Sequence, residues 1–250
     1  MTLLSRKIVG IRIDHTSYQA ATALVLGWAQ KRESRYVCAA NVHMVMEAYD
    51  ASAFREVVNN ADLVTPDGMP LVWSMRRLGF PSQSRVYGPD LMLHVIEQAA
   101  VQKIPIGFLG GRPEVLDKLM INLSRQFPSL DVRYFFSPPF RPILPEEDDQ
   151  MVSEINRSGV RILFVGLGCP RQEIWMANHS GKILSVMLGV GVAFDFHAGV
   201  IRQSPAWMQN IGLEWLFRFA QEPRRLARRY LYHNPRFMLL LLRQLLWHKP

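Results

Sequence analysis

A glycine-rich turn between a buried strand and a helix constrains this chain more than any other stretch of its sequence. Residues 161–165 are short, apolar and rich in β-branched side chains, which is typical of a buried parallel strand. Gly166-Leu167-Gly168-Cys169-Pro170 follows, and Pro170 suits the first turn of a helix because that position needs no backbone N–H. Such a turn brings unpaired N–H groups and a helix N-terminus together, which favours binding of a phosphate or diphosphate.

A dinucleotide-binding fingerprint is the main alternative for this turn. That fingerprint has a third glycine, which lets the helix pack closely on the strand. Arg171 stands in its place here, and Phe194 does so in the later run that begins at Gly189. A P-loop is also absent, because no Gly-Lys-Ser/Thr follows any glycine run. The missing glycine argues against a dinucleotide site. A nucleotide-dependent oxidoreductase remains an alternative, and binding of a nicotinamide cofactor would test it.

Strand and helix patterns alternate along the chain up to about residue 200. Apolar strand patterns occur at residues 7–14, 36–40, 63–64, 104–109, 132–136, 161–165 and 183–188, with helical patterns between them, including one over residues 43–60. This alternation predicts an α/β fold with a parallel, Rossmann-like sheet and helices on both faces. Ligands bind such sheets beyond the carboxyl ends of the strands. The glycine and proline motifs at residues 65–70, 110–113, 166–173 and 189–199 lie at those ends, so we expect one composite site.

The positive charge of the chain is concentrated at its C-terminal end. The net charge is +8, and residues 212–250 hold eight basic residues against two acidic ones, a net charge of +6. Such a segment suits nucleic acid, anionic lipid or an acidic ligand. The apolar run of residues 237–247 is too short to span a bilayer and Arg243 interrupts it. We therefore expect a helix in the membrane interface, with arginines toward anionic head groups.

A nucleic-acid-binding protein that uses this basic segment is the alternative from another class. Against it, the arginines alternate with leucine and phenylalanine runs that nucleic-acid binding would leave exposed. Salt-sensitive binding to mixed-sequence duplex, in preference to anionic liposomes, would favour this alternative.

Composition and cysteine content indicate the cellular compartment in which the protein folds. Hydrophobic residues make up 49% of the chain and charged residues 20%, which is typical of a folded protein. Two cysteines, Cys38 and Cys169, form no disulfide framework and indicate a reducing cytoplasm. The first residues lack an apolar core of signal-peptide length, and no membrane-spanning run occurs. We expect a cytoplasmic protein that is peripheral on the membrane.

Three residues in the turns could carry chemistry, and each has a structural alternative. Asp67 follows a strand in a Pro-Asp-Gly turn, where it is either a rigidly held carboxylate or an aspartate bonded to its own turn. Asp195 either binds a ribose hydroxyl or caps a turn. Cys169 is either a nucleophile at a helix N-terminus or a small residue in a tight turn. Nearby His197 is expected to be structural.

No spacing of histidine, cysteine, aspartate or glutamate indicates a metal site, so we expect neither a metal nor another cofactor. The acidic run at residues 146–149 is expected in the first turn of a helix, where acidic groups interact favourably with the helix dipole.

Five motifs, taken together and in order, resemble the WecG/TagA/CpsF family of bacterial glycosyltransferases over about residues 8–245. They are Thr65-Pro66-Asp67-Gly68, Gly110-Gly111-x-Pro113, Gly166-x-Gly168-x-Pro170-x-Gln172-Glu173, Gly189-Val190-Gly191-x-x-Phe194-Asp195 and Gly212-Leu213-Glu214-Trp215. The resemblance implies an inverting, metal-independent transfer of a sugar from a UDP-sugar to a polyprenyl-diphosphate-linked saccharide. The transfer serves surface polysaccharide biosynthesis at the cytoplasmic face of the membrane.

The resemblance also implies roles for individual residues. Asp67 matches the general base of the family, and the substrate-binding residues are assigned as Asn41, Thr65, Arg85 and Gln172. The nucleotide is assigned to Gly110, Gly111, Gly166, Gly168, Pro170, Glu173 and Asp195, and the leaving diphosphate to Arg224, Arg225, Arg228 and Arg229. Ala39 departs from the hydroxyl residue often found in its place in the family. The resemblance therefore implies a UDP-sugar-dependent hexosyl or N-acetylhexosaminyl transferase. Members use different sugars, so the identity of the donor sugar and of the acceptor does not carry over, and the oligomeric state stays open.

The predicted organisation follows from these roles. Residues 1–200 form an α/β core, in which the part to about residue 103 carries the base. The Rossmann-like part, about residues 104–200, holds the nucleotide. Residues 201–250 form a helical, basic appendage that associates with the membrane.

Overall fold

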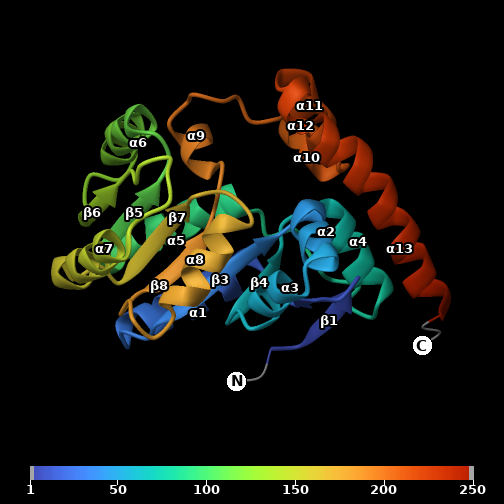
Figure 1. Ribbon diagram of the computed structural model, residues 1–250, viewed down its shortest axis with the longest axis horizontal. Helices are drawn as coiled ribbons and strands as arrows, with labels where there is room; N and C mark the ends of the chain where they lie inside the picture. The colour runs from blue at the N-terminus through green and yellow to red at the C-terminus, as the bar shows by residue number, and fades with distance from the viewer. Residues whose placement is uncertain (1–2, 248–250) are drawn as a thin grey trace.

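The computed structural model describes residues 3–247, and a six-stranded parallel sheet forms its centre (Figure 1). The strand order is β4-β3-β8-β7-β5-β6, and all neighbours are parallel. The strands are β3 (Arg35–Ala40), β4 (Leu63–Pro66), β5 (Ile106–Gly110), β6 (Val132–Phe136), β7 (Ile162–Gly166) and β8 (Val186–Gly189). The predicted α/β fold with a parallel sheet is therefore confirmed.

Side chains of each strand alternate between two cores, one on each face of the sheet. In β7, Ile162 and Phe164 enter one core, whereas Leu163 and Val165 enter the other. The first face is covered by α1 (Tyr18–Gln30), α5 (Gly88–Gln102), α6 (Pro113–Gln126) and α9 (Ala193–His197). The second is covered by α2 (Val42–Asp50), α3 (Ser52–Asn59), α4 (Met69–Arg77), α7 (Pro145–Ser158) and α8 (Arg171–His179).

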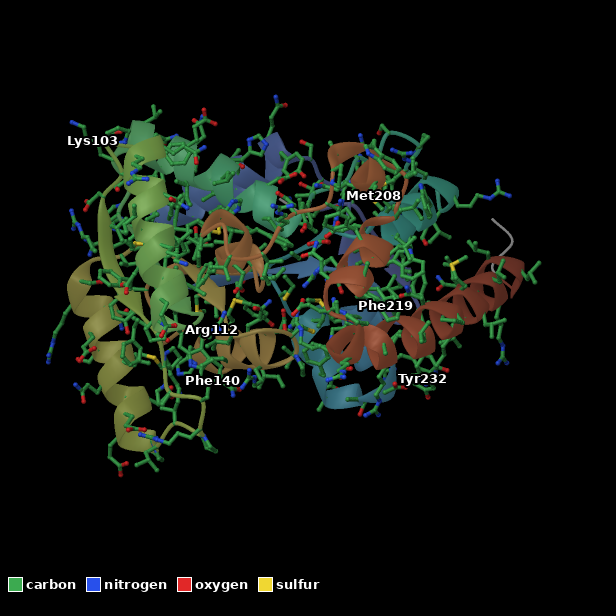
Figure 2. All side chains as sticks on the ribbon, turned by 90° about the horizontal axis from the view of Figure 1, so that it is seen from above. Lys103, Arg112, Phe140, Met208, Phe219 and Tyr232 are labelled. Atoms are coloured by element: carbon green, nitrogen blue, oxygen red, sulfur yellow. The ribbon has the colours of Figure 1, made fainter. Side chains whose placement is uncertain are left out.

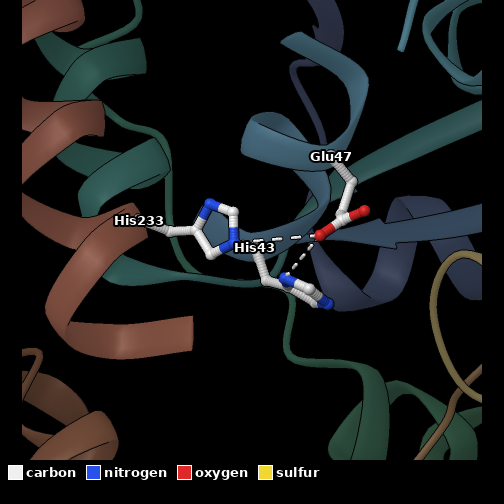
Figure 3. Close-up of side chains that lie close together, drawn as sticks. All are labelled: His43, Glu47 and His233. Carbon is white, nitrogen blue, oxygen red and sulfur yellow. Dashed lines mark ion pairs between the residues drawn. The ribbon is translucent and has the colours of Figure 1, made fainter. Parts of the chain in front are cut away.

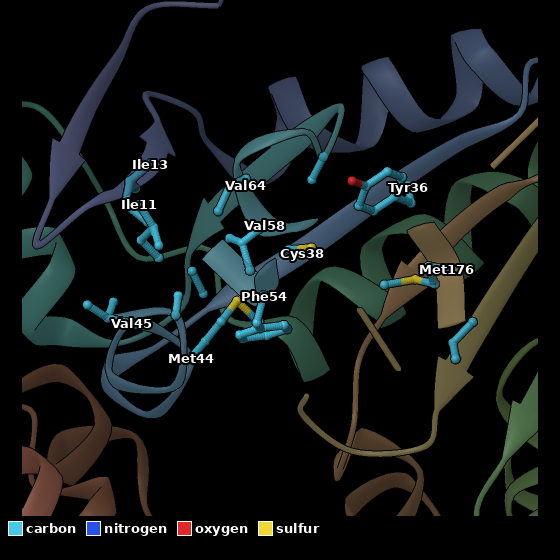
Figure 4. Packing of buried hydrophobic residues seen from close by; sticks show 14 of the residues in the cluster. Ile11, Ile13, Tyr36, Cys38, Met44, Val45, Phe54, Val58, Val64 and Met176 are labelled. Carbon is cyan, nitrogen blue, oxygen red and sulfur yellow. The ribbon is translucent and has the colours of Figure 1, made fainter. Parts of the chain in front are cut away.

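Figure 4 shows part of the second core, where side chains of α2 and α3 meet the sheet. Phe54 and Val58 of α3 lie beside Cys38 of β3 in this cluster. Because helices bury both faces, the strands need apolar residues at successive positions. For this reason, continuous apolar runs in the sequence predict these strands.

Two segments differ from the sequence-based expectation. Residues 7–14 are an antiparallel hairpin of β1 (Ser5–Ile8) and β2 (Ile11–Asp14), a separate two-stranded sheet. The backbone reverses at Val9 and Gly10, both with positive φ, and the apolar residues on either side of this turn resemble one longer strand. The helical stretch predicted over residues 43–60 is interrupted at Ala51, whose extended backbone separates α2 from α3.

The C-terminal part is helical, as predicted, and packs against the sheet domain. It consists of α10 (Ala206–Asn210), α11 (Glu214–Gln221), α12 (Pro223–Ala227), a π-helical turn η1 (Arg228–Tyr232) and α13 (His233–Trp247). Figure 1 shows α13 passing beside α2 and α4. Phe237 and Leu241 of α13 are buried in the second core, and Gln244 hydrogen-bonds the backbone of Lys7 and Val9 in the hairpin.

Helix α13 is thus anchored to the core rather than detached from it. Residues 248–250 of the predicted appendage lie outside the described residues. Strands β3 and β4 share one sheet with β5 to β8, and the functional division of the core at about residue 103 stays a prediction. Within residues 3–247, no helix has both the length and the apolar character that crossing a bilayer requires.

Candidate active site

A cavity of about 1370 Å³ lies between the carboxyl ends of the strands and the appendage. Its walls include the segments that follow β3, β4, β5, β7 and β8, so the structure brings the predicted motifs to one place. Figure 2 looks down on this region, with Arg112 and Phe140 on the side of the sheet and Phe219 on the appendage. The appendage residues on the cavity wall include Leu213, Glu214, Trp215, Arg218, Arg225 and Arg229.

Asp67 lies on the cavity wall directly after β4, and it is only 9% exposed. Its Oδ2 accepts a hydrogen bond of 3.0 Å from the backbone N–H of Gly88, the first residue of α5. The carboxylate is therefore held by a distant element and not by its own turn. Burial raises the pKa of Asp67 to about 6, against the opposing effects of Arg85 and of the Gly88 N–H. A carboxyl with this pKa is suited to accept a proton near neutral pH.

Arg85 connects Asp67 to the appendage. Its Nε donates to the backbone carbonyl of Asp67, and its Nη2 lies 3.7 Å from Asp67 Oδ1. The same Nη2 donates to Oε2 of Glu214, the first residue of α11. Tyr87 donates its hydroxyl to Glu214 Oε1 at 2.7 Å, and its ring stacks under the Arg85 guanidinium. The charge of Glu214 in turn raises the pKa of Asp67.

Sequence reasoning assigned Arg85 but gave no role to Glu214 or Tyr87. Glu214 belongs to the last of the five motifs, which carried no assigned role for it, and it lies more than a hundred residues from Arg85 in the sequence. The packing of the appendage over the strand ends brings the two together, and no spacing in the sequence indicates it.

The two glycines that end β5 and β7 line the cavity, but packing explains why they are glycines. A Cβ on Gly110 would lie 2.6 Å from the backbone of Gly166, and one on Gly166 would lie 2.7 Å from the ring of Phe194. Gly168 differs from both, because its φ of +81° favours glycine while open space surrounds the position of its missing Cβ. Of these three glycines, Gly168 has the geometry expected for close approach of a ligand.

Gln172 and Glu173 support this turn from the first turn of α8. Gln172 accepts a hydrogen bond from the Gly168 N–H at 3.2 Å and donates one to Glu173 Oε1 at 2.7 Å. Glu173 is fully buried, and its Oε2 has no hydrogen-bond partner among the described residues. Burial raises the pKa of Glu173 to about 7. Burial and the nearby Glu173 also raise the pKa of the Cys169 thiol, which argues against a thiolate nucleophile.

Two further assigned residues also line the cavity. Asn41 caps α2, since its Oδ1 accepts a hydrogen bond of 3.2 Å from the Met44 N–H. Asp195 lies in α9, where burial raises its pKa and Arg112 and Arg225 oppose that shift.

Four assigned residues lie off the cavity wall: Thr65, Pro170, Arg224 and Arg228. Thr65 is fully buried and donates its hydroxyl to the carbonyl of Val86 at 3.3 Å, so its contacts are internal. Pro170 is the N-cap of α8, whose first residue is Arg171, one position later than predicted.

The four assigned arginines of α12 and η1 divide between the cavity wall and the outer surface. Arg225 and Arg229 line the cavity, whereas Arg224 and Arg228 are exposed away from it. Arg218, which sequence reasoning did not assign, joins them from α11 and packs over the ring of Phe196. The pKa of Arg229 is lowered by its burial.

Two structural expectations are confirmed. The Nε2 of His197 lies 2.9 Å from the carbonyl of Pro89, in a structural contact. The acidic run begins α7, where Glu147 accepts a hydrogen bond from the Leu144 N–H and Asp148 pairs with His179.

These features define a class of enzyme. A parallel α/β sheet opens onto a cavity with a buried carboxyl of raised pKa on one side and arginines on the other. This arrangement suits transfer of a group from an anionic donor to an acceptor that must lose a proton.

The chain belongs to the glycosyl transferase WecG/TagA/CpsF family, whose profile matches residues 6–250. It is therefore a glycosyltransferase of cell-surface polysaccharide biosynthesis. The resemblance read from the five motifs is confirmed.

Proposed function

We propose that this protein transfers a sugar from a UDP-sugar to a polyprenyl-diphosphate-linked saccharide, with inversion and without a metal ion in the transfer step. The observation that carries the proposal is the position of Asp67. This buried carboxyl with a pKa of about 6 shares a cavity with three arginines of the appendage, Arg218, Arg225 and Arg229.

The proposed reaction is a single displacement. The acceptor hydroxyl gives its proton to Asp67 while its oxygen attacks the anomeric carbon of the donor. The bond between that carbon and the UDP oxygen breaks on the opposite face, so the configuration inverts. Negative charge develops on the leaving diphosphate, and Arg225 and Arg229 supply positive charge at the cavity wall to stabilise it.

The size of the cavity supports a reaction between two substrates. Its volume of about 1370 Å³ exceeds the 300–1,000 Å³ that is typical for one small ligand. A nucleotide sugar and the terminal saccharide of an acceptor would therefore have room side by side.

The surface of the appendage supports an acceptor held in a membrane. Its large apolar side chains that remain exposed are Trp207, Ile211, Trp215, Leu216, Leu231, Tyr232, Met238, Leu239, Leu242 and Leu246. Exposed apolar residues next to arginines are typical of helices that lie in the membrane interface. We propose that this surface binds the cytoplasmic face of the membrane, where the lipid-linked acceptor would be presented.

Mass spectrometry of the lipid-linked product tests the function directly. The purified protein, a polyprenyl-diphosphate-linked saccharide and a panel of UDP-sugars should yield a product heavier by one sugar residue. GDP- and dTDP-sugars serve as matched controls. Absence of product with every UDP-sugar, together with product from another nucleotide sugar, would overturn the choice of donor.

Leu239→Gln, Leu242→Gln and Leu246→Gln, combined in one variant, should abolish most liposome binding. These leucines are 69%, 52% and 74% exposed, so their replacement leaves the core intact. Partial burial of three leucines in lipid contributes roughly 3 kcal/mol, and its loss weakens binding about 100-fold. Co-sedimentation with anionic vesicles measures the effect. Deleting α13 would be a poor test, because Phe237 and Leu241 are buried against the core.

The matched control carries Val101→Gln and Ile121→Gln, which change exposed apolar residues of α5 and α6. It should sediment like the unmodified protein. Equal sedimentation of both variants would exclude this face of α13 as the membrane-binding surface.

A further inference from the structure

His43, Glu47 and His233 form a cluster where the appendage meets the core (Figure 3). His43 and Glu47 lie one turn apart on α2, and His233 is the first residue of α13. Glu47 Oε1 lies 3.6 Å from His43 Nδ1 and 3.8 Å from His233 Nε2. One side-chain nitrogen or oxygen from each residue lies within 4.8 Å of the other two.

Hydrogen bonding between these side chains does not account for the cluster. The two distances to Glu47 exceed those of ordinary hydrogen bonds. Nδ1 of His43, the nitrogen that faces Glu47, is buried and has no hydrogen-bond partner among the described residues. A buried polar atom of this kind calls for a partner that the protein chain does not supply. His233 faces Glu47 with its Nε2.

A backbone carbonyl lies next to the ring of His43. The Cys169 carbonyl acts on the His43 ring as a hydrogen-bond acceptor. An acceptor of this kind commonly orients a ligating imidazole.

The surrounding charges are mixed. Arg229 lies near both histidines, and Arg236 and Asp50 lie near His233. Arg236 is neutralised by a two-point ion pair with Asp50. The positive charge of Arg229 disfavours binding of a cation, whereas the negative charge of the Glu47 carboxylate favours it.

We propose that His43, Glu47 and His233 bind a zinc ion that fastens α13 to α2. Two imidazole nitrogens and one carboxylate oxygen are ligands that zinc accepts, whereas magnesium and calcium prefer oxygen alone. Bond lengths of about 2.0–2.2 Å in a tetrahedral site place ligand atoms about 3.3–3.5 Å apart. The two distances to Glu47, 3.6 and 3.8 Å, are close to this range, and the two histidine nitrogens lie within 4.8 Å of each other. A water molecule would complete the site.

This zinc ion would have a positioning role that goes beyond the proposed function. Helix α2 begins after Asn41, which lines the cavity, and α13 continues the appendage that carries Arg225 and Arg229. A metal between the two helices would hold the two cavity walls together without taking part in the transfer step.

Zinc binding by the full chain tests the site. After removal of metal with a chelator, the protein should take up stoichiometric zinc, measured by elemental analysis after gel filtration. Added Co²⁺ should give the visible absorption of a nitrogen- and oxygen-ligated site. Zinc should also raise the Tm. His233→Ala and Glu47→Gln should lose all three responses, while their metal-free Tm stays near that of the metal-free unmodified protein.

His94→Asn is the matched control, because His94 is exposed on α5 and lies outside the cluster. It should bind zinc normally, and so should Asp67→Asn, so failure of the transferase proposal would leave this result unchanged. Glu47→Gln keeps the shape of the side chain and guards against a folding defect in His233→Ala. Failure of the unmodified protein to bind zinc, or equal binding by Glu47→Gln and His94→Asn, would overturn the proposal.

Discussion

Asp67→Asn is expected to lower turnover by at least about 100-fold, because the amide cannot accept the proton of the acceptor hydroxyl. The fold should persist, since the asparagine Oδ1 can still accept the hydrogen bond from the Gly88 N–H. Single-turnover kinetics at pH 7.5, with saturating donor and acceptor, measure the effect. Turnover within a few-fold of the unmodified protein would leave Asp67 as a structural residue only.

The same substitution should increase stability at neutral pH. The pKa of Asp67 is about 6 in the fold and about 4 in an unfolded chain, so the ionised carboxylate disfavours folding by up to ~3 kcal/mol above pH 6. This penalty grows as the pH rises from 4 to 6 and is absent below pH 4. Urea unfolding should therefore show that Asp67→Asn is the more stable protein at pH 7.5, and the difference should shrink as the pH falls toward 4.

Glu214→Gln provides a second, independent test of the base. Turnover of the unmodified protein should rise with pH through about pH 6, as Asp67 loses its proton. Removing the charge of Glu214 removes one cause of the raised pKa, so this rise should move to lower pH. An unchanged profile in Glu214→Gln would show that another group controls the pH dependence.

Arg225→Ala combined with Arg229→Ala is expected to lower turnover by at least about 100-fold, even with a short-chain acceptor analogue that needs no membrane. Both arginines line the cavity, and loss of a single preorganised group at a developing charge already costs about 10²–10³ in rate. Kinetics with the soluble analogue separate this effect from membrane binding.

Arg224→Ala combined with Arg228→Ala is the matched control, because it removes the same charge from the same basic segment off the cavity wall. Turnover of the soluble analogue should stay within a few-fold of the unmodified value. Binding to anionic vesicles should fall by roughly 30-fold, at about 1 kcal/mol for each arginine. If both double variants keep full turnover of the analogue, the arginines serve lipid binding alone.

The parts of the candidate site that lie in short local motifs were predictable from the sequence. The Pro-Asp-Gly turn placed Asp67 at a strand end, because parallel strands direct their carboxyl ends to one edge of the sheet. Arg85 and Gln172 came from the family resemblance, and both lie on the cavity wall. The reason for glycine at Gly110 and Gly166 was not predictable, since it depends on contacts between segments far apart in the chain.

The cluster of His43, Glu47 and His233 was likewise not predictable from local sequence. His43 and Glu47 are one helical turn apart, but this pair alone is common on protein helices and was not singled out. Its third member, His233, comes from nearly two hundred residues further along the chain. Only the packing of α13 on α2 brings it within reach.

By itself, the sequence determined the class of fold and the family, and it placed Asp67 at the end of a strand, because strand and helix periodicity and tight-turn motifs are local properties of a chain. The tertiary structure alone decided which arginines face the cavity, that Glu214 shares Arg85 with Asp67, and that the apolar end of the chain is partly core. The physical reason is that these contacts join the appendage to strand ends and helices far away in sequence. The burial of each contact and the charges around it depend on how the helices pack. The spacing of residues in the sequence does not predict that packing.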